Sequence, residues 1–453
     1  MQPKSPPSEQ PELFRSALVN LVDRRRPLVH LAGLIDWDRF ATAFGVLYRE
    51  GVGRPGLPTR LMVGQHLIKH MDGLSDDAAC ARFLDSPYVH LFCGESHFQH
   101  ALPLDRSSMT FWRKRIGAEQ LELLLAETLA AAQRAGAAAP KHFQRVTIDT
   151  TVQPKAMTHT TDSKLLHRGV DILGRLARQH GIVLRQSYTR LSTHARREVA
   201  RLIHRGRHRE AECKVSRMRT WLGRLSRDIA RKIAGTAAAV RAALATPIER
   251  VVRLLRQRRD DRGRKKIYAL HAPEVERIAK GKARTRFEFG CKVSLAITSR
   301  VAPGSQFVVG ARSLPGNPFD GYTLAAQIAQ TERITGVPIA RADVDSGYRG
   351  HNADKNRVFL SGQKPGVTPT IRSELTRRAT IEPVIGHTKE DGHLGRNFLA
   401  GATGDAISVV PAAAGHNLRL LRAWLIRLLV FLLSILAISR LMHPMPAGLL
   451  TAR

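Results

Sequence analysis

The segment RFEFGCKVSLAIT, residues 286–298, decides the fold class of this chain. Its apolar side chains recur at every second position, which is the period of a β-strand with one buried face. Two more strand-like segments follow it, SQFVVGARSL at residues 305–314 and VPIARADVDSGYRG at residues 337–350. Residues 316–336 lie between these two and read as a loop that leads into a helix. Strands separated by helices predict an α/β fold.

The same alternation occurs far upstream, in PKHFQRVTIDTTV at residues 140–152. Residues 163–265, between these strand regions, have a helical pattern and many basic side chains. Residues 190–232 alone carry fourteen Lys and Arg against four Asp and Glu. We therefore predict a helical insertion with a cationic face that contacts phosphate, the alternative being a basic face that is merely solvated.

The N-terminal region, residues 15–135, also has a helical pattern. Within it, PTRLMVGQHLIKHMDGLSDDAACARFL spans residues 58–84 and predicts two helices separated at Gly73, the second capped by Ser75. This helix–turn–helix outline suits DNA contact, although two short helices joined by a turn are common in any fold.

A basic segment, PLDRSSMTFWRKRIG, follows at residues 103–117. We expect Ser107 or Ser108 to cap a helix there and Trp112 to pack inside. The neighbouring cations predict phosphate contacts, and a solvated basic face is the alternative. These cations are Arg113, Lys114 and Arg115.

Composition points to a partner with dense negative charge. The 453 residues carry a formal net charge of +34 and are 43% hydrophobic, so the chain can bury a core. Nucleic acid is the first candidate partner and an anionic membrane surface the second. The four cysteines form no CxxC pair, which argues against a disulfide framework or a structural zinc site. We expect a cytoplasmic, nucleoid-associated protein without a signal peptide.

The apolar run LLVFLLSILAI, residues 428–438, is shorter than the roughly 20 residues that a membrane-spanning helix needs. Arginines flank it on both sides. We expect a helix that packs in the core or against a partner rather than in a membrane.

Three acids mark a candidate metal site. Asp149 and Asp345 stand at the ends of predicted strands, and Glu382 lies in RRATIEPVIGHTKED, residues 377–391. Mg²⁺ or Mn²⁺ prefers such oxygen ligands, and a pair of ions can promote displacement at a phosphodiester. Asp343 competes with Asp345 because both lie on one face of their strand, but Asp345 is nearer the turn.

The surroundings of Glu382 suit that role. Arg378, Glu382 and Lys389 share one face if the segment is helical. Pro383 places Glu382 in the first turns of that helix, where backbone amides have no intrahelical partner. A surface helix with an ordinary ion pair is the alternative.

Several blocks of this sequence resemble the transposases of bacterial insertion sequences, in particular the insertion-sequence-five family with its DDE catalytic domain. The likeness extends over residues 15–430. In the N-terminal part it rests on PTRLMVGQHLIKHMDGLSD and FCGESHFQHALPLDRSSMTFWRKRIG. Further on it rests on VTIDTTVQPKAM, LPGNPFDGYTL, VDSGYRGH, GVTPTIRSEL and IEPVIGHTKEDGHLGRNFL.

The resemblance implies an RNase H-like catalytic core with Asp149, Asp345 and Glu382 as catalytic metal ligands. It also implies that Arg378 and Lys389 contact DNA, although Leu375 stands where the family has a tyrosine and Ser346 where a cation is common. We add Tyr348 and Arg349 as DNA contacts.

The expected domains follow from these assignments. They are a leader at 1–14, a helical DNA-binding domain at 15–135, the core at 140–162 and 271–415, the basic insertion at 163–270, and an apolar helix and tail at 416–453.

The expected function is a DDE transposase that binds the terminal inverted repeats of its own element, cuts the DNA and joins the freed end to a target. We expect two or more copies on double-stranded DNA and no nucleotide requirement, because the chain lacks a GxxxxGK[ST] loop. The alternatives are a stand-alone nuclease, an inactive DNA-binding relative and a membrane-surface protein.

Overall fold

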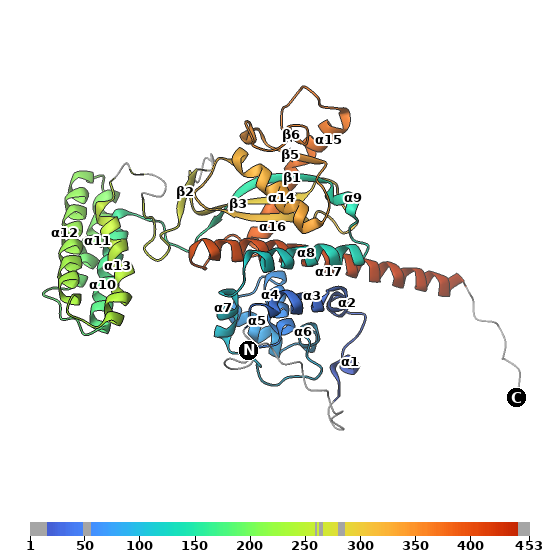
Figure 1. Cartoon of the computed structure of the whole chain (residues 1–453), viewed down its shortest axis with the longest axis horizontal. Helices are drawn as coiled ribbons and strands as arrows, with labels where there is room; N and C mark the ends of the chain where they lie inside the picture. Colours follow the sequence, from blue (N-terminus) through green and yellow to red (C-terminus); the bar gives the residue numbers. More distant parts are fainter. Residues whose placement is uncertain (1–15, 49–55, 259–260, 262–265, 280–285, 443–453) are drawn as a thin grey trace, which may run out of the picture.

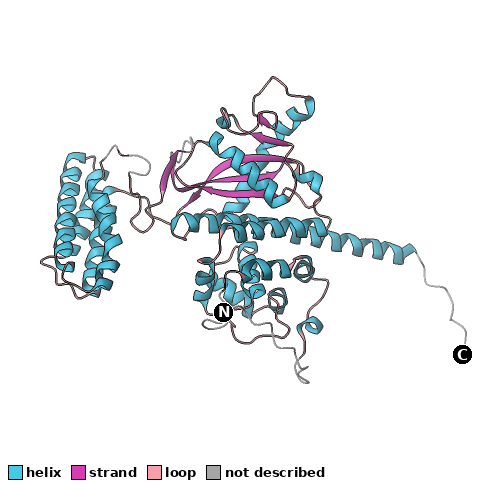
Figure 2. Cartoon of the chain, in the orientation of Figure 1, coloured by secondary structure: helices cyan, strands magenta, loops and turns pink. Residues whose placement is uncertain are grey.

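A computed structural model describes residues 16–48, 56–258, 261, 266–279 and 286–442 of the chain. The leader expected at residues 1–14 lies outside these ranges. Figure 1 shows a sheet with its helices, a group of N-terminal helices and a separate helical bundle. The predicted α/β class is confirmed, since helices and strands alternate in the part that holds the sheet (Figure 2).

The sheet has six strands, with β3 paired to three others. Strand β3 runs antiparallel to β1, β2 and β4, and β5 lies parallel to β1 and to β6. Strand β1 is therefore central, with antiparallel neighbours on one side and parallel ones on the other. The strands are β1 (Arg145–Pro154), β2 (Glu276–Ala279), β3 (Phe287–Thr298), β4 (Val308–Leu314), β5 (Arg341–Val344) and β6 (Val358–Leu360).

All strands predicted from alternation are present. Strands β1 and β3 leave no room for a side chain at Gly290, where a Cβ would stand 2.0 Å from the carbonyl oxygen of Gln153. Glycine is therefore required for β1 and β3 to pair at this point. Helix α14 (Leu324–Thr335) packs on β3 and β4 and leads into β5. Two helices that follow β6 also contact the sheet, α15 (Pro369–Arg377) at β5 and β6 and α16 (Ile381–Glu390) at β1.

The N-terminal helices pack around α4 (Thr59–Met71), most of which is buried. Ser75 caps α5 (Asp76–Leu84) by accepting a hydrogen bond from the amide of Ala78, as predicted. The cap of α7 (Arg106–Arg113) is Asp105, so the prediction of Ser107 or Ser108 was wrong. The other helices of this group are α1 (Leu18–Leu21), α2 (Pro27–Leu34), α3 (Trp37–Gly45), α6 (Pro87–Phe92), α8 (Ala118–Arg134) and α9 (Pro140–Phe143).

The long helix α17 (Gly401–Met442) connects the N-terminal helices to the sheet (Figure 1). It packs on α4, α8 and β4, and one hydrophobic core extends from Leu31 to Leu421 through both parts. The domain boundary expected at residue 416 falls inside this helix. Beyond Trp424 the helix leaves the body of the protein and exposes apolar side chains, among them Val430 and Phe431. None of the described helices meets the length and apolarity that crossing a membrane demands.

The basic insertion forms a four-helix bundle beside the sheet (Figure 1). Its helices are α10 (Asp162–Gln179), α11 (Thr189–His204), α12 (His208–Ile233) and α13 (Ala238–Arg256). They enclose a hydrophobic core of their own, which includes Leu173, Leu222 and Val251. A separate core is what an independently folded insertion requires.

Candidate active site

The register between β1 and β5 places two of the predicted acids side by side. The strands are parallel, with Thr147 opposite Asp343. Asp149 lies two residues beyond Thr147, and Asp345 two residues beyond Asp343, just past the end of β5. The two carboxylates are therefore level on neighbouring strands, and they interact electrostatically.

Burial and like charge act together on Asp149. Burial, aided by repulsion from Asp345 and Asp320, raises the pKa of its carboxyl to about 6. The backbone amide of Thr150, 2.7 Å from Oδ1, and the nearby guanidinium of Arg378 act in the opposite direction. Any further positive charge placed near this carboxylate stabilises its ionised form.

Sequence reasoning missed Asp320, which lies near the aspartate pair. It begins a short 3₁₀ helix, η2 (Asp320–Thr323), that packs on η3 (Ser346–Tyr348) next to Asp345. Lys292 on β3 donates a hydrogen bond to its Oδ1 at 2.9 Å. Asp320 follows β4 in a loop, and nothing in the neighbouring residues indicates that it lies near Asp149. Only the strand order brings that loop toward β1.

Tyr348, which we predicted as a DNA contact, is fully buried, and its hydroxyl lies within electrostatic range of the aspartates. Burial raises the pKa of its hydroxyl, and the charges of Asp149, Asp320 and Asp345 raise it further. The hydroxyl faces that of Ser294, but neither makes a hydrogen bond of normal geometry within the described residues. Tyr348 is therefore a buried and uncharged neighbour of the aspartate pair.

The segment with the third predicted acid reaches the site through Arg378. This residue begins the 3₁₀ helix η4 (Arg378–Thr380), and its Nη1 lies 3.3 Å from Asp149 Oδ2. Glu382 and Pro383 are the second and third residues of α16, in its first turn as predicted. The Glu382 side chain is exposed. Arg378 thus makes the direct link between this segment and Asp149.

Aspartate oxygens are ligands that Mg²⁺ prefers, and one or two protein carboxylates suffice when water and phosphate supply the rest. Asp149 and Asp345 fit this requirement in kind and position. In the described part of the chain, no three His, Cys, Asp or Glu side chains gather closely enough to hold a metal ion. Asp149, Asp345 and Glu382 are therefore not assembled into one cluster in this conformation.

Asp343, the competitor of Asp345, is fully buried. Its Oδ2 accepts a hydrogen bond from the Ser299 hydroxyl, and its Oδ1 has no hydrogen-bond partner in the described structure. The nearby Arg145 and Arg341 both pair with Glu374. Burial and the charge of Glu374 raise the pKa of Asp343 to about 7. This environment is closed to a substrate, whereas Asp345 is only half-buried.

The predicted DNA contacts divide by exposure. Arg113 is buried and donates hydrogen bonds of 2.8 and 2.5 Å to Asp76, so its guanidinium is engaged by a carboxylate rather than open to a phosphate. Lys389 is half-buried, 4.0 Å from Glu288. The remaining three are exposed: Lys114, Arg115 and Arg349.

Comparison with known proteins adds family evidence to this geometry. Residues 16–115 match the family model described as a transposase domain (DUF772). The chain is 49% identical over 204 residues to the uncharacterized protein ORF8 in the nfe locus of Rhizobium meliloti. This alignment covers 45% of the chain and 98% of that protein. No solved structure matches the chain. On these grounds the chain belongs to a transposase-like family that includes the Rhizobium meliloti ORF8 protein.

Proposed function

We propose that this protein is a DDE transposase similar to those of the insertion-sequence-five family. The observation that carries the proposal is the pair Asp149 and Asp345 on adjacent parallel strands, where burial and like charge raise the pKa of Asp149 to about 6. The strand order β4-β3-β1-β5-β6 supports an RNase H-like core, because that fold joins an antiparallel set to two further parallel strands. The transposase domain at residues 16–115 supports the same reading.

The proposed reaction exchanges phosphodiester bonds at the ends of the mobile element. Water attacks the phosphorus at the element end, the bond to the 3′ oxygen breaks, and a 3′ hydroxyl and a 5′ phosphate result. The freed 3′ hydroxyl then attacks a phosphodiester of the target DNA. Each step forms one bond to phosphorus and breaks one, so no nucleotide is consumed.

Asp149 and Asp345 are the residues that would hold a divalent cation, Mg²⁺ or Mn²⁺. When bound, such an ion supplies Lewis acidity for the attacking and leaving oxygens. Arg378 now neutralises Asp149. In the proposal, this arginine turns to the DNA phosphate once another cation neutralises Asp149. Glu382 lies one helical turn further along the same segment and joins the site through the same movement.

Cleavage assays with matched variants test this function. The substrate is duplex DNA with the ends that flank the protein's own gene, incubated with Mg²⁺ and mapped for cuts. D149N and D345N are expected to abolish cleavage and to retain DNA binding, and E382Q to reduce cleavage strongly. D343N is the matched control, an Asp-to-Asn change two residues from Asp345, and should cut normally. Unchanged cleavage by D149N or D345N would remove the basis of the proposal.

The exposed position of Glu382 favours a second candidate, a relative that binds DNA without joining it. A pre-cleaved element end with a free 3′ hydroxyl distinguishes the candidates. A transposase joins this end to target DNA, a nuclease cuts but does not join, and an inactive relative only binds.

Joining two element ends calls for at least two copies of the chain, and the proposal includes a dimer on DNA in the nucleoid. The exposed apolar turns of α17 are the candidate contact. F431E/L433E is expected to lower the mass of the protein–DNA complex in analytical ultracentrifugation. An unchanged mass would place the dimer contact elsewhere.

A further inference from the structure

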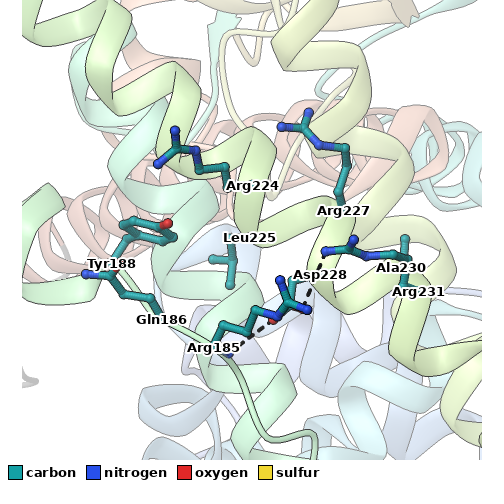
Figure 3. Close-up of a pocket in the computed structure, with 9 residues that line it drawn as sticks. All are labelled: Arg185, Gln186, Tyr188, Arg224, Leu225, Arg227, Asp228, Ala230 and Arg231. Carbon is teal, nitrogen blue, oxygen red and sulfur yellow. Dashed lines mark hydrogen bonds and ion pairs between the residues drawn. The ribbon is translucent and has the colours of Figure 1, made fainter.

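The helical bundle contains a hollow of about 590 Å³ that lies apart from the aspartate pair (Figure 3). We call it the arginine hollow. The segment before α11 and the second half of α12 form its walls. The residues that matter for its chemistry are Arg185, Tyr188, Arg224, Arg227, Asp228 and Arg231.

Three of the arginines lie on one face of α12. Arg224, Arg227 and Arg231 are three and four residues apart, the spacing that aligns side chains along a helix. All three are exposed, and Arg224 and Arg227 have no acidic partner in the described residues. Like charges at this spacing repel one another, so a bound anion would relieve that repulsion.

Asp228 is the only carboxylate that lines the hollow, and its oxygens are already engaged. Oδ2 accepts hydrogen bonds from the backbone amide of Arg185 at 3.2 Å and from Lys232 at 3.1 Å. Arg231 lies 3.8 Å from Oδ1. Burial opposes ionisation of this carboxyl, but these hydrogen bonds outweigh it and lower the pKa of Asp228. Asp228 therefore anchors the Arg185 segment to α12, and the Arg185 charge also lowers the pKa of this carboxyl. The guanidiniums of Arg224 and Arg227 remain without a carboxylate partner among the described residues.

Tyr188 shapes the opposite wall. Its φ of 55° lies in the left-handed region, which an aromatic residue rarely adopts because of backbone strain. Its ring stacks on Trp221, with centroids 6.1 Å apart and planes 13° apart. The strained turn brings Arg185 and Tyr188 to face the α12 arginines, as Figure 3 shows. Strain retained in a charged concave site points to a binding role.

We propose that the arginine hollow binds phosphodiester groups of duplex DNA, as a contact separate from the cleavage site. Guanidinium groups match phosphate oxygens with paired hydrogen bonds and keep their charge at any physiological pH. The inference rests on the proposed function only in taking DNA as the substrate. It identifies where the basic insertion grips the backbone.

Salt-dependent binding of the full chain to duplex DNA tests the proposal. In fluorescence anisotropy, the logarithm of the binding constant falls linearly with the logarithm of salt concentration, by about 0.9 per phosphate contact. R224A/R227A is expected to reduce this slope by about 1.8. The control is R205A/R209A, with the same charge change in the same bundle. Arg205 and Arg209 are exposed, and about 22 Å of helix separates Arg209 from Arg224. The control should leave the slope unchanged, and circular dichroism verifies that both variants fold.

Each outcome decides the matter. Equal slopes for the two double variants, or no change in R224A/R227A, would overturn the proposal. The proposal would also be overturned if R224A/R227A lost binding to phosphatidylserine vesicles but bound DNA normally. The hollow would then be a contact for a membrane surface. The cleavage assay tests the proposed function separately. If binding depends on these arginines but no cleavage occurs, only the proposed function is refuted. If cleavage occurs and the salt slope of R224A/R227A is unchanged, only this inference is refuted.

Discussion

Replacing Asp343 by Asn is expected to stabilise the protein at neutral pH, although the residue is fully buried at the centre of the sheet. Its carboxyl lies beside two arginines, Arg145 and Arg341, but both of these pair with Glu374. Its Oδ1 has no hydrogen-bond partner in the described structure. The folded protein therefore favours the neutral form of this side chain, which Asn imitates in shape and charge.

The magnitude follows from the raised pKa. In the folded chain the pKa of Asp343 is raised to about 7, against an ordinary value of 3.8 for an aspartate exposed to water. Between these two values the folded state keeps a proton that the unfolded state has lost, so the free energy of unfolding falls as pH rises. The loss is complete above about pH 7 and is of the order of 4 kcal/mol at 1.36 kcal/mol per pH unit. D343N avoids this loss, but a buried Asn amide without a hydrogen-bond partner costs about 1–3 kcal/mol, so the net stabilisation is smaller by that amount.

Urea unfolding followed by circular dichroism between pH 4.5 and 8.5 measures this difference. The advantage of D343N over the natural chain should grow as pH rises to about 7 and then stay constant. If the two stability curves run parallel, or if the advantage of D343N over the natural chain shrinks as pH rises, Asp343 is ionised in the folded protein. Either result would refute the reasoning. D345N is the matched comparison, because its side chain is only half-buried.

Three further outcomes follow from particular contacts. Asp76→Ala leaves the buried Arg113 without its carboxylate, so the free energy of unfolding should drop by about 3–5 kcal/mol in thermal or urea melts; a loss below about 1 kcal/mol would contradict the buried pair. Gly290→Ala forces a methyl group against the Gln153 carbonyl at 2.0 Å, so soluble yield and melting temperature should both fall, and an unchanged melting temperature would speak against this strand pairing. Because the pKa of Asp149 is about 6, calorimetric Mn²⁺ affinity should fall up to tenfold per pH unit below pH 6 and level off above it; equal affinity at pH 4.5 and 7.5 would exclude Asp149 as a ligand.

Local patterns in the sequence were enough for the secondary structure near the site. Alternation predicted β1, β3, β4 and β5, and Pro383 correctly placed Glu382 in the first turn of α16. The Ser75 cap was predicted for the same reason, since a cap depends on residues within one turn. The candidate metal role of the three acids came from their residue type and position, the family resemblance implies the same role, and their chemistry stays a prediction.

Other features had no local signature. Sequence spacing could not show that Arg113 is buried against Asp76, because a basic run on a helix looks the same whether it faces solvent or a carboxylate. Nor could the spacing show that α17 continues unbroken through Pro411. The cost of that proline is offset by the packing of the helix on α4, α8 and β4.

By itself, the sequence determined which segments become strands or helices and that the chain is strongly basic, because both depend on side-chain type and short spacing. Only the tertiary structure decided that Asp345 rather than Asp343 lies open beside Asp149, and that Asp320 and Lys292 border the pair. Strand order and register bring these residues together across gaps of up to 196 positions, from Asp149 to Asp345. Such contacts depend on how whole elements pack, and no local pattern records that.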